Sequence, residues 1–171
     1  FERGDYIDYL IVVPVTLEAS VKNFVDFKKG EGYNVIVESL QTPQITLQGI
    51  TNLIAQHYKN DGTDFVLMIG DEKTLPMYTA STSGGSTPSD LQYYTMEGAN
   101  DNVPDMFFGR IAAKDATDIG ERLAKTIEFD QKSYKDSKGM SHVVGIASDE
   151  GSNPSDNDYI TSIEQKLATA Y

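Results

Sequence analysis

The protein has 171 residues, 26 of them acidic and 14 basic, with no cysteine and a formal net charge of −12. This length and a hydrophobic content of 39% suit a folded domain. The negative charge argues against binding to nucleic acid or to an anionic membrane, and it favours cationic partners such as metal ions. The lack of cysteine excludes disulfides, thiolate metal sites and a cysteine nucleophile within these residues, and no apolar run approaches the roughly 20 residues of a membrane span.

The first part of the chain alternates short apolar runs with helical patterns. Residues 9–13, 33–37 and 65–69 are typical of strands, and the first and third are apolar enough to be buried on both faces. Apolar residues at helical spacing predict two helices between them: Val21, Phe24 and Val25 in the first, and Leu47, Ile50, Ile54 and Tyr58 in the second. This alternation predicts a parallel sheet covered by helices on both faces.

The pattern changes after this third strand. Residues 79–90 are rich in Ser, Thr and Gly and are expected to form an exposed loop, followed by a short strand at 91–96. Further strands are predicted at 106–109 and 142–148. Two more helices are indicated by the apolar stripes Ile119, Leu123 and Ile127, and Ile160, Ile163 and Leu167. Because an α/β sheet normally continues with a strand after such a helix, we expect the sequence to be interrupted at Tyr171.

Carboxylates follow two of the predicted strands. Residues 70–73 read Gly-Asp-Glu-Lys and residues 148–151 read Ser-Asp-Glu-Gly. Ligands of open parallel sheets gather beyond the carboxyl ends of the strands, so both segments are candidate functional positions. The alternative is that each is a solvated turn with an acidic helix cap.

A loop rich in oxygen ligands precedes the strand at 106–109. Glu97, Gly98, Asn100, Asp101 and Asp105 supply the carboxylate, amide and carbonyl oxygens that calcium prefers. The EF-hand pattern is absent. The alternative is a loop of Asx turns that binds no metal.

Three other polar residues are considered for chemistry. Arg110 is expected to pair with a carboxylate, with the binding of a substrate carboxylate as the alternative. His57 and His142 have no partner histidine at metal-binding spacing and no serine elbow nearby, so we interpret both as structural or solvated.

An ordered set of motifs runs along most of the chain. It comprises FVDFK at 24–28, GYNV at 32–35, FVLMIGD at 65–71, LP at 75–76, SD at 89–90, FFGRI at 107–111, TIEF at 126–129 and GIASDEG at 145–151. This set resembles the N-terminal part of the gingipain-type cysteine peptidases. The resemblance implies a three-layer, caspase-like (flavodoxin-like) α/β fold, with a first subdomain over about residues 1–138 and the start of a second over 139–171.

The resemblance also implies roles for particular residues. Glu150 matches a glutamate that supports the catalytic histidine, and the loop from Gly98 to Asp105 matches a calcium-binding loop of the family. Asp158, or Asp156 as second choice, matches an acid that selects basic side chains of the substrate. The catalytic Cys and His of the family have no counterpart in this sequence.

The main hypothesis is therefore the N-terminal portion of a secreted or cell-surface cysteine endopeptidase that acts on polypeptides. Its Cys and His would lie on a remaining part of the peptidase domain, either because the enzyme is nicked or because the sequence is partial. The alternative is a non-catalytic pseudo-peptidase module for surface attachment or assembly. A flavodoxin-like or receiver-type binding domain is a weaker third hypothesis.

Overall fold

The computed structural model describes residues 6–98, 101–132, 142–148, 151 and 154–170. The chain forms two compact units, Phe1–Asp130 and Gln131–Tyr171. The subdomain boundary near residue 138 stays a prediction. None of the helices that the structure describes is both long enough and apolar enough to span a bilayer.

A four-stranded parallel sheet forms the centre of the first unit. Its strands are β1 (Asp8–Pro14), β2 (Asn34–Leu40), β3 (Phe65–Ile69) and β6 (Phe107–Ile111), in the order β2-β1-β3-β6. All three neighbouring pairs are parallel, with Ile11 opposite Val37 on one side and Leu67 on the other. Residues Leu10 to Val13 of β1 are completely buried, as the continuous apolar run predicts.

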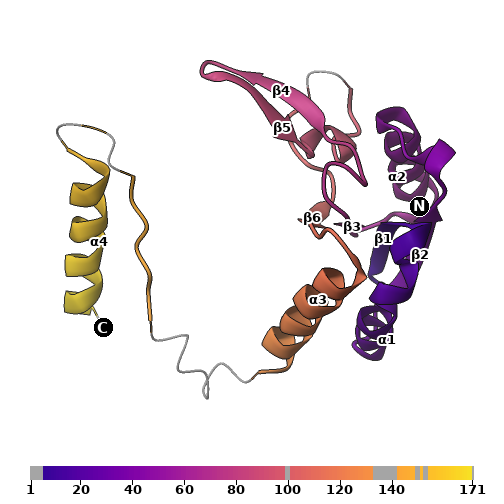
Figure 1. Ribbon diagram of the computed structural model, residues 1–171, viewed down its shortest axis with the longest axis horizontal. Coiled ribbons are helices and arrows are strands. Elements are labelled where there is room, and N and C mark those ends of the chain that lie inside the picture. Colours follow the sequence, from indigo (N-terminus) through magenta and orange to yellow (C-terminus); the bar gives the residue numbers. More distant parts are fainter. Residues whose placement is uncertain (1–5, 99–100, 133–141, 149–150, 152–153, 171) are drawn as a thin grey trace. The chain divides into compact units, whose positions relative to one another are not determined.

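Helices cover both faces of this sheet (Figure 1). The helical segments are η1 (Val15–Val21), α1 (Lys22–Gly30), η2 (Thr42–Gln44), α2 (Leu47–Asp61), η3 (Leu91–Tyr93) and α3 (Ala116–Gln131). One core cluster joins Ile50 and Ile54 of α2 to the even-numbered residues of β1, and the other joins Phe24 of α1 and Ile119 of α3 to the odd-numbered ones. The predicted three-layer α/β architecture is confirmed.

The ends of α2 follow the sequence signals. The Thr46 hydroxyl accepts a hydrogen bond from the Gly49 amide at 3.0 Å and caps the first turn. At the other end Gly62 adopts a left-handed φ of 72°, and its amide donates to the Tyr58 carbonyl. These caps fix where β3 begins, three residues after Gly62.

The predicted exposed loop at residues 79–90 is instead a hairpin. Strands β4 (Tyr78–Thr82) and β5 (Gly85–Ser89) pair antiparallel, with Ala80 opposite Thr87. Gly85 supplies a positive φ of 127° next to the turn. The segment shows no apolar alternation because β5 is largely exposed, so the prediction of a loop was wrong although that of exposure was right.

The predicted strand at residues 91–96 was also wrong, because η3 and a turn occupy this segment. Tyr93 and Tyr94 are adjacent and both are 0% exposed. A strand would direct these two rings to opposite faces, whereas the short helical turn buries both in the same core cluster.

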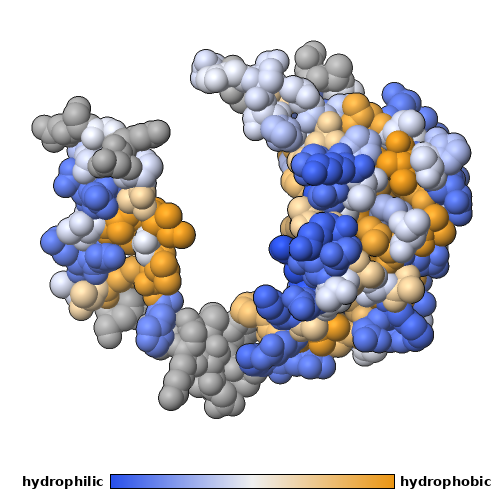
Figure 2. Space-filling view, in the orientation of Figure 1, coloured by the Kyte–Doolittle hydropathy of each residue, from blue (hydrophilic) through white to orange (hydrophobic). Residues whose placement is uncertain are grey.

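The second unit contains helix α4 (Asp156–Ala170), which carries the predicted apolar stripe. Residues 142–148 are not a strand, because they have no ladder partner among the described residues, and Val143, Val144 and Ile146 are 72–87% exposed. Figure 2 accordingly shows hydrophobic surface along one side of this unit.

Candidate functional site

The carboxyl edge of the sheet is organised by Arg110, the fourth residue of β6. Its Nε donates to Asp90 Oδ2 at 2.7 Å and its Nη2 donates to Asp90 Oδ1 at 2.8 Å. Only 8% of the Arg110 side chain and 12% of the Asp90 side chain are exposed. Asp90 directly follows β5, so this ion pair ties the β4–β5 hairpin to the parallel sheet.

The Nη1 group of Arg110 binds backbone carbonyls in the segment that follows β3. Nη1 donates to the carbonyls of Gly70 at 2.9 Å and Leu75 at 3.1 Å. Burial alone would lower the pKa of Arg110, but the hydrogen bonds and charge of Asp90 outweigh that effect and raise it. The expected pairing with a carboxylate is confirmed. A guanidinium engaged in this way acts as a brace and is not presented to a substrate carboxylate.

The carboxylate after β3 stabilises a turn. Asp71 Oδ1 accepts hydrogen bonds from the Thr74 hydroxyl and amide, both at 3.0 Å, and from the Lys73 amide at 3.1 Å. These bonds, led by the Thr74 hydroxyl, lower the pKa of Asp71. Gly70 has a φ of 140°, and a Cβ there would lie 2.5 Å from Thr74 Oγ1. The turn interpretation of residues 70–73 is therefore the one that the geometry favours.

The predicted calcium loop contains carboxylates that cap its own backbone. Asp105 Oδ2 accepts from the Met96 amide at 2.7 Å, and Asp101 accepts from the Glu97 amide at 3.2 Å and the Val103 amide at 3.0 Å. Asn100 lies outside the described residues. Within the described ranges, no three acidic or histidine side chains converge as a metal site. These contacts fit the Asx-turn alternative, and calcium binding stays a prediction.

The predicted specificity residues lie at the start of α4. Asp158 Oδ2 accepts from the Ser155 amide and hydroxyl, both at 2.8 Å, which lowers the pKa of Asp158 through the amide first and the hydroxyl second. The Ser155 hydroxyl in turn accepts from the Asp158 amide at 3.2 Å, so the two residues form a reciprocal cap. Asp156 accepts a hydrogen bond from the Ser148 hydroxyl.

Glu150, the predicted support of the catalytic histidine, lies outside the described residues.

His57 is held between two carboxylates. Its Nε2 lies 2.8 Å from Glu38 Oε1 on β2 and its Nδ1 lies 2.7 Å from Asp61 Oδ2 on α2. The ring is 15% exposed. Because it links a helix to the adjacent strand, the structural interpretation of His57 is the one that the geometry favours.

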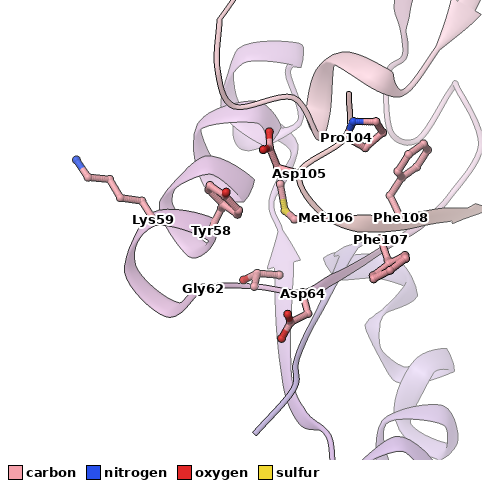
Figure 3. Close-up of a pocket in the computed structure, with 10 residues that line it drawn as sticks. Tyr58, Lys59, Gly62, Asp64, Pro104, Asp105, Met106, Phe107 and Phe108 are labelled. Atoms are coloured by element: carbon pink, nitrogen blue, oxygen red, sulfur yellow. The ribbon is translucent and has the colours of Figure 1, made fainter. Parts of the chain in front are cut away.

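A cavity of about 970 Å³ at the amino end of β3 and β6 was not foreseen from the sequence. Figure 3 shows Tyr58 and Lys59 of α2 on one side of it and the segment from Pro104 to Phe108 on the other. Thr63 also lines it, and its hydroxyl is buried without a hydrogen-bond partner. No sequence signal marks this cavity, because the segments that form it are about 40 residues apart.

Comparison with known proteins gives a consistent result along the chain. The model of Peptidase family C25 matches residues 3–171. Gingipain R2 of Porphyromonas gingivalis strain W83 is 29% identical over 153 residues, which are 86% of this chain and 20% of that protein. Gingipain R1 of the same species is 29% identical over 153 residues, 86% of this chain and 15% of that protein.

Two solved structures share the fold over nearly the whole chain. The crystal structure of the Arg-specific cysteine proteinase gingipain R has a TM-score of 0.78 at 25% identity, covering 98% of this chain and 40% of that one. A complex of the pro- and mature domains of Porphyromonas gingivalis RgpB has a TM-score of 0.78 at 25% identity, covering 95% of this chain and 39% of that one. The chain thus spans less than half of each of these four relatives.

Proposed function

The chain belongs to peptidase family C25, and we propose that it is the N-terminal portion of a secreted or cell-surface cysteine endopeptidase. The observation that carries the proposal is the family match over residues 3–171 in a sequence that contains no cysteine. A cysteine peptidase needs a thiolate nucleophile, so the catalytic Cys and His would lie on the remaining part of the peptidase domain.

The reaction would be hydrolysis of a peptide bond in a polypeptide. The thiolate attacks the scissile carbonyl, the imidazolium protonates the leaving amine to give a thioester, and water then releases the acyl group. Within this chain, Glu150 would accept a hydrogen bond from that histidine, fix its tautomer and stabilise its protonated form. Asp158, or Asp156, would select a basic side chain of the substrate by charge.

Calcium is proposed as a structural ion at the loop that contains Glu97, Gly98, Asn100, Asp101 and Asp105. The support is the number of hard oxygen donors in this loop and the overall charge of −12, which favours a divalent cation. The ion would hold the loop that leads into β6 and take no part in bond cleavage.

Replacement of Glu150 by Gln in the complete enzyme tests the proposed catalytic role. The amide keeps the size of the side chain but cannot stabilise an imidazolium, so we expect kcat to fall at least tenfold with an unchanged Tm. Glu72→Gln is the matched control, because Glu72 also follows a strand end, and it should leave kcat within twofold of the original. An unchanged kcat in Glu150→Gln would contradict the role.

The non-catalytic alternative rests on the same lack of cysteine. Intact-mass measurement of the native protein, with peptide mapping beyond Tyr171, separates the two hypotheses. A companion segment with Cys and His supports the peptidase. A native molecule without such a segment supports a pseudo-peptidase module.

A further inference from the structure

A buried lysine joins helix α1 to the end of helix α3. The Lys28 ammonium donates to Glu31 at 2.8 Å and to Asp130 at 2.7 Å. Lys28 is only 9% exposed, which is rare for a lysine. Glu31 directly follows α1, whereas Asp130 is 102 residues away from Lys28 and belongs to the last turn of α3. Of these two contacts, the one with Asp130 therefore connects distant segments of the first unit.

Three aromatic rings fix the position of this ammonium group. Its Nζ lies 5.7 Å from the ring centroid of Phe24, 5.1 Å from that of Phe27 and 5.3 Å from that of Tyr33. Such rings attract a cation through their negative faces. Burial lowers the pKa of Lys28, but its hydrogen bonds, led by the one with Asp130, outweigh that effect and raise the pKa. Lys28 is thus a charged group held in one place.

The last turn of α3 is acidic at the wrong end of the helix. Residues 128–131 read Glu-Phe-Asp-Gln, so this turn contains two carboxylates and no basic residue. The carboxyl end of a helix carries a partial negative charge, and acidic side chains there destabilise it. The positive charge of Lys28 offsets this effect from the neighbouring helix.

Apolar packing in the core of the first unit stops before this turn. Ile119, Leu123 and Ile127 of α3 belong to or pack against the core cluster that contains Phe24 of α1. Ile127 is the last residue of α3 in that cluster. The final turn is therefore held to α1 by a charge and not by burial in this cluster.

We propose that the Lys28–Asp130 pair is a latch for the last turn of α3, which stays helical while the pair is intact and unwinds when it is lost. Asp130 is the last residue of the first unit, and the chain continues from it into the second unit. A residue spans about 3.3 Å when extended and about 1.5 Å in a helix, so unwinding one turn adds roughly 7 Å to the connection. The latch sets the length of free chain between the two units, in a peptidase and in a non-catalytic module alike.

Amide hydrogen exchange of the complete protein tests the latch. Lys28→Met keeps an unbranched side chain against the three rings but removes the charge. We expect the amides of residues 129–131 to exchange at least tenfold faster than in the original protein, and those of residues 119–123 to accelerate less. The amides of 129–131 donate to carbonyls one turn earlier, so their exchange reports on the last turn. Lys132→Gln removes a positive charge just after the helix and is the control, with an expected change below threefold.

Double variants identify the charge that is responsible. In the Lys28→Met background, Asp130→Asn removes the uncompensated acid from the helix end and should return the exchange of residues 129–131 to within threefold of the original. Glu31→Gln in the same background is the matched control, because Glu31 binds the same ammonium and is 36% exposed against 30% for Asp130. It should not restore slow exchange, since Glu31 is not part of α3.

Equal acceleration along the whole of α3 in Lys28→Met would overturn the proposal, because it would indicate a general loss of stability. An equal effect of Lys132→Gln, or recovery with Glu31→Gln as complete as with Asp130→Asn, would also overturn it. If Lys28→Met fails to fold, Asp130→Ala replaces it with Glu31→Ala as control. Alanine by itself favours a helix, so faster exchange of residues 129–131 in Asp130→Ala alone supports the latch, and unchanged exchange contradicts it.

Discussion

Asp90 and Arg110 form a bidentate ion pair, with 2.7 Å between Asp90 Oδ2 and Arg110 Nε and 2.8 Å between Asp90 Oδ1 and Arg110 Nη2. The pair is almost completely buried and joins the end of the hairpin to the edge strand of the parallel sheet. Arg110 also binds two carbonyls after β3, so one side chain links three segments of the first unit.

Asp90→Asn should destabilise the fold strongly, because it leaves the Arg110 charge buried without its counter-charge. Removing one partner of a buried ion pair costs about 3 to 5 kcal/mol. Asp118→Asn is the matched control: it breaks a pair with Arg122, which is 52% exposed, and exposed ion pairs contribute far less to stability than buried ones. Urea unfolding of both variants measures the difference. Equal losses of free energy would contradict the bracing role of Asp90.

Gly70→Ala should also lower stability. Position 70 has a φ of 140°, and the added methyl group would meet Thr74 Oγ1 at 2.5 Å, so we expect a loss of more than about 1 kcal/mol. Gly120→Ala in α3 is the opposite case, since its Cβ meets nothing within 4 Å and alanine favours a helix by about 1 kcal/mol. Thermal unfolding should shift Tm down for the first variant and up for the second. The same sign for both would refute this account of the turn.

Asp71 should contribute pH-dependent stability. Its pKa in the folded protein is below the ordinary value of 3.8, because the Thr74 hydroxyl and the amides of the turn favour the carboxylate. The stabilisation is therefore fully present above that value and is lost as the pH falls through the lowered pKa. Asp71→Asn keeps an oxygen acceptor but cannot titrate, so its stability relative to the original protein should improve as the pH falls. A pH-independent difference between the two would show that Asp71 has no lowered pKa.

Calcium should stabilise the complete protein if the loop at 97–105 binds it. At a hundredfold excess over Kd the free energy of unfolding rises by about 2.7 kcal/mol, so calcium should raise Tm. EDTA should reverse the increase, and magnesium at the same concentration is the control ion. Asp101→Asn should reduce the response. A Tm that is unaffected by calcium and EDTA would remove the ion and leave the Asx-turn alternative.

The sequence predicts the parallel sheet well because strands β1 and β3 are continuous apolar runs and helix α2 has clear caps. Residues 65–69 and the α2 boundaries at Thr46 and Gly62 agree with the structure. The β4–β5 hairpin was not predictable from hydrophobicity, because β5 is largely exposed and lacks apolar alternation. Residues 142–148 have strand-like composition, yet a strand also needs a neighbour, and none is present among the described residues.

For the site as well, features that depend on neighbouring residues could be predicted from the sequence, whereas contacts between distant residues could not. The charge of Arg110 predicts that it pairs with a carboxylate. Its partner Asp90 is 20 residues away in the sequence, so only the structure identifies it. Asp158 was assigned to a substrate pocket by motif matching, whereas its contacts in the structure cap α4. The exposure of Phe107 and Phe108 could not be predicted, since apolar runs are expected to be buried.

Labelling the complete native protein with a thiol-directed peptidyl inhibitor, followed by mapping of the modified residue, tests whether this chain is part of a cysteine endopeptidase. We expect one labelled cysteine, on a segment outside these 171 residues that remains bound to or continuous with them, and loss of peptide hydrolysis in proportion to labelling. Absence of any labelled cysteine from a folded, complete protein would contradict the claim that this chain is part of a cysteine endopeptidase.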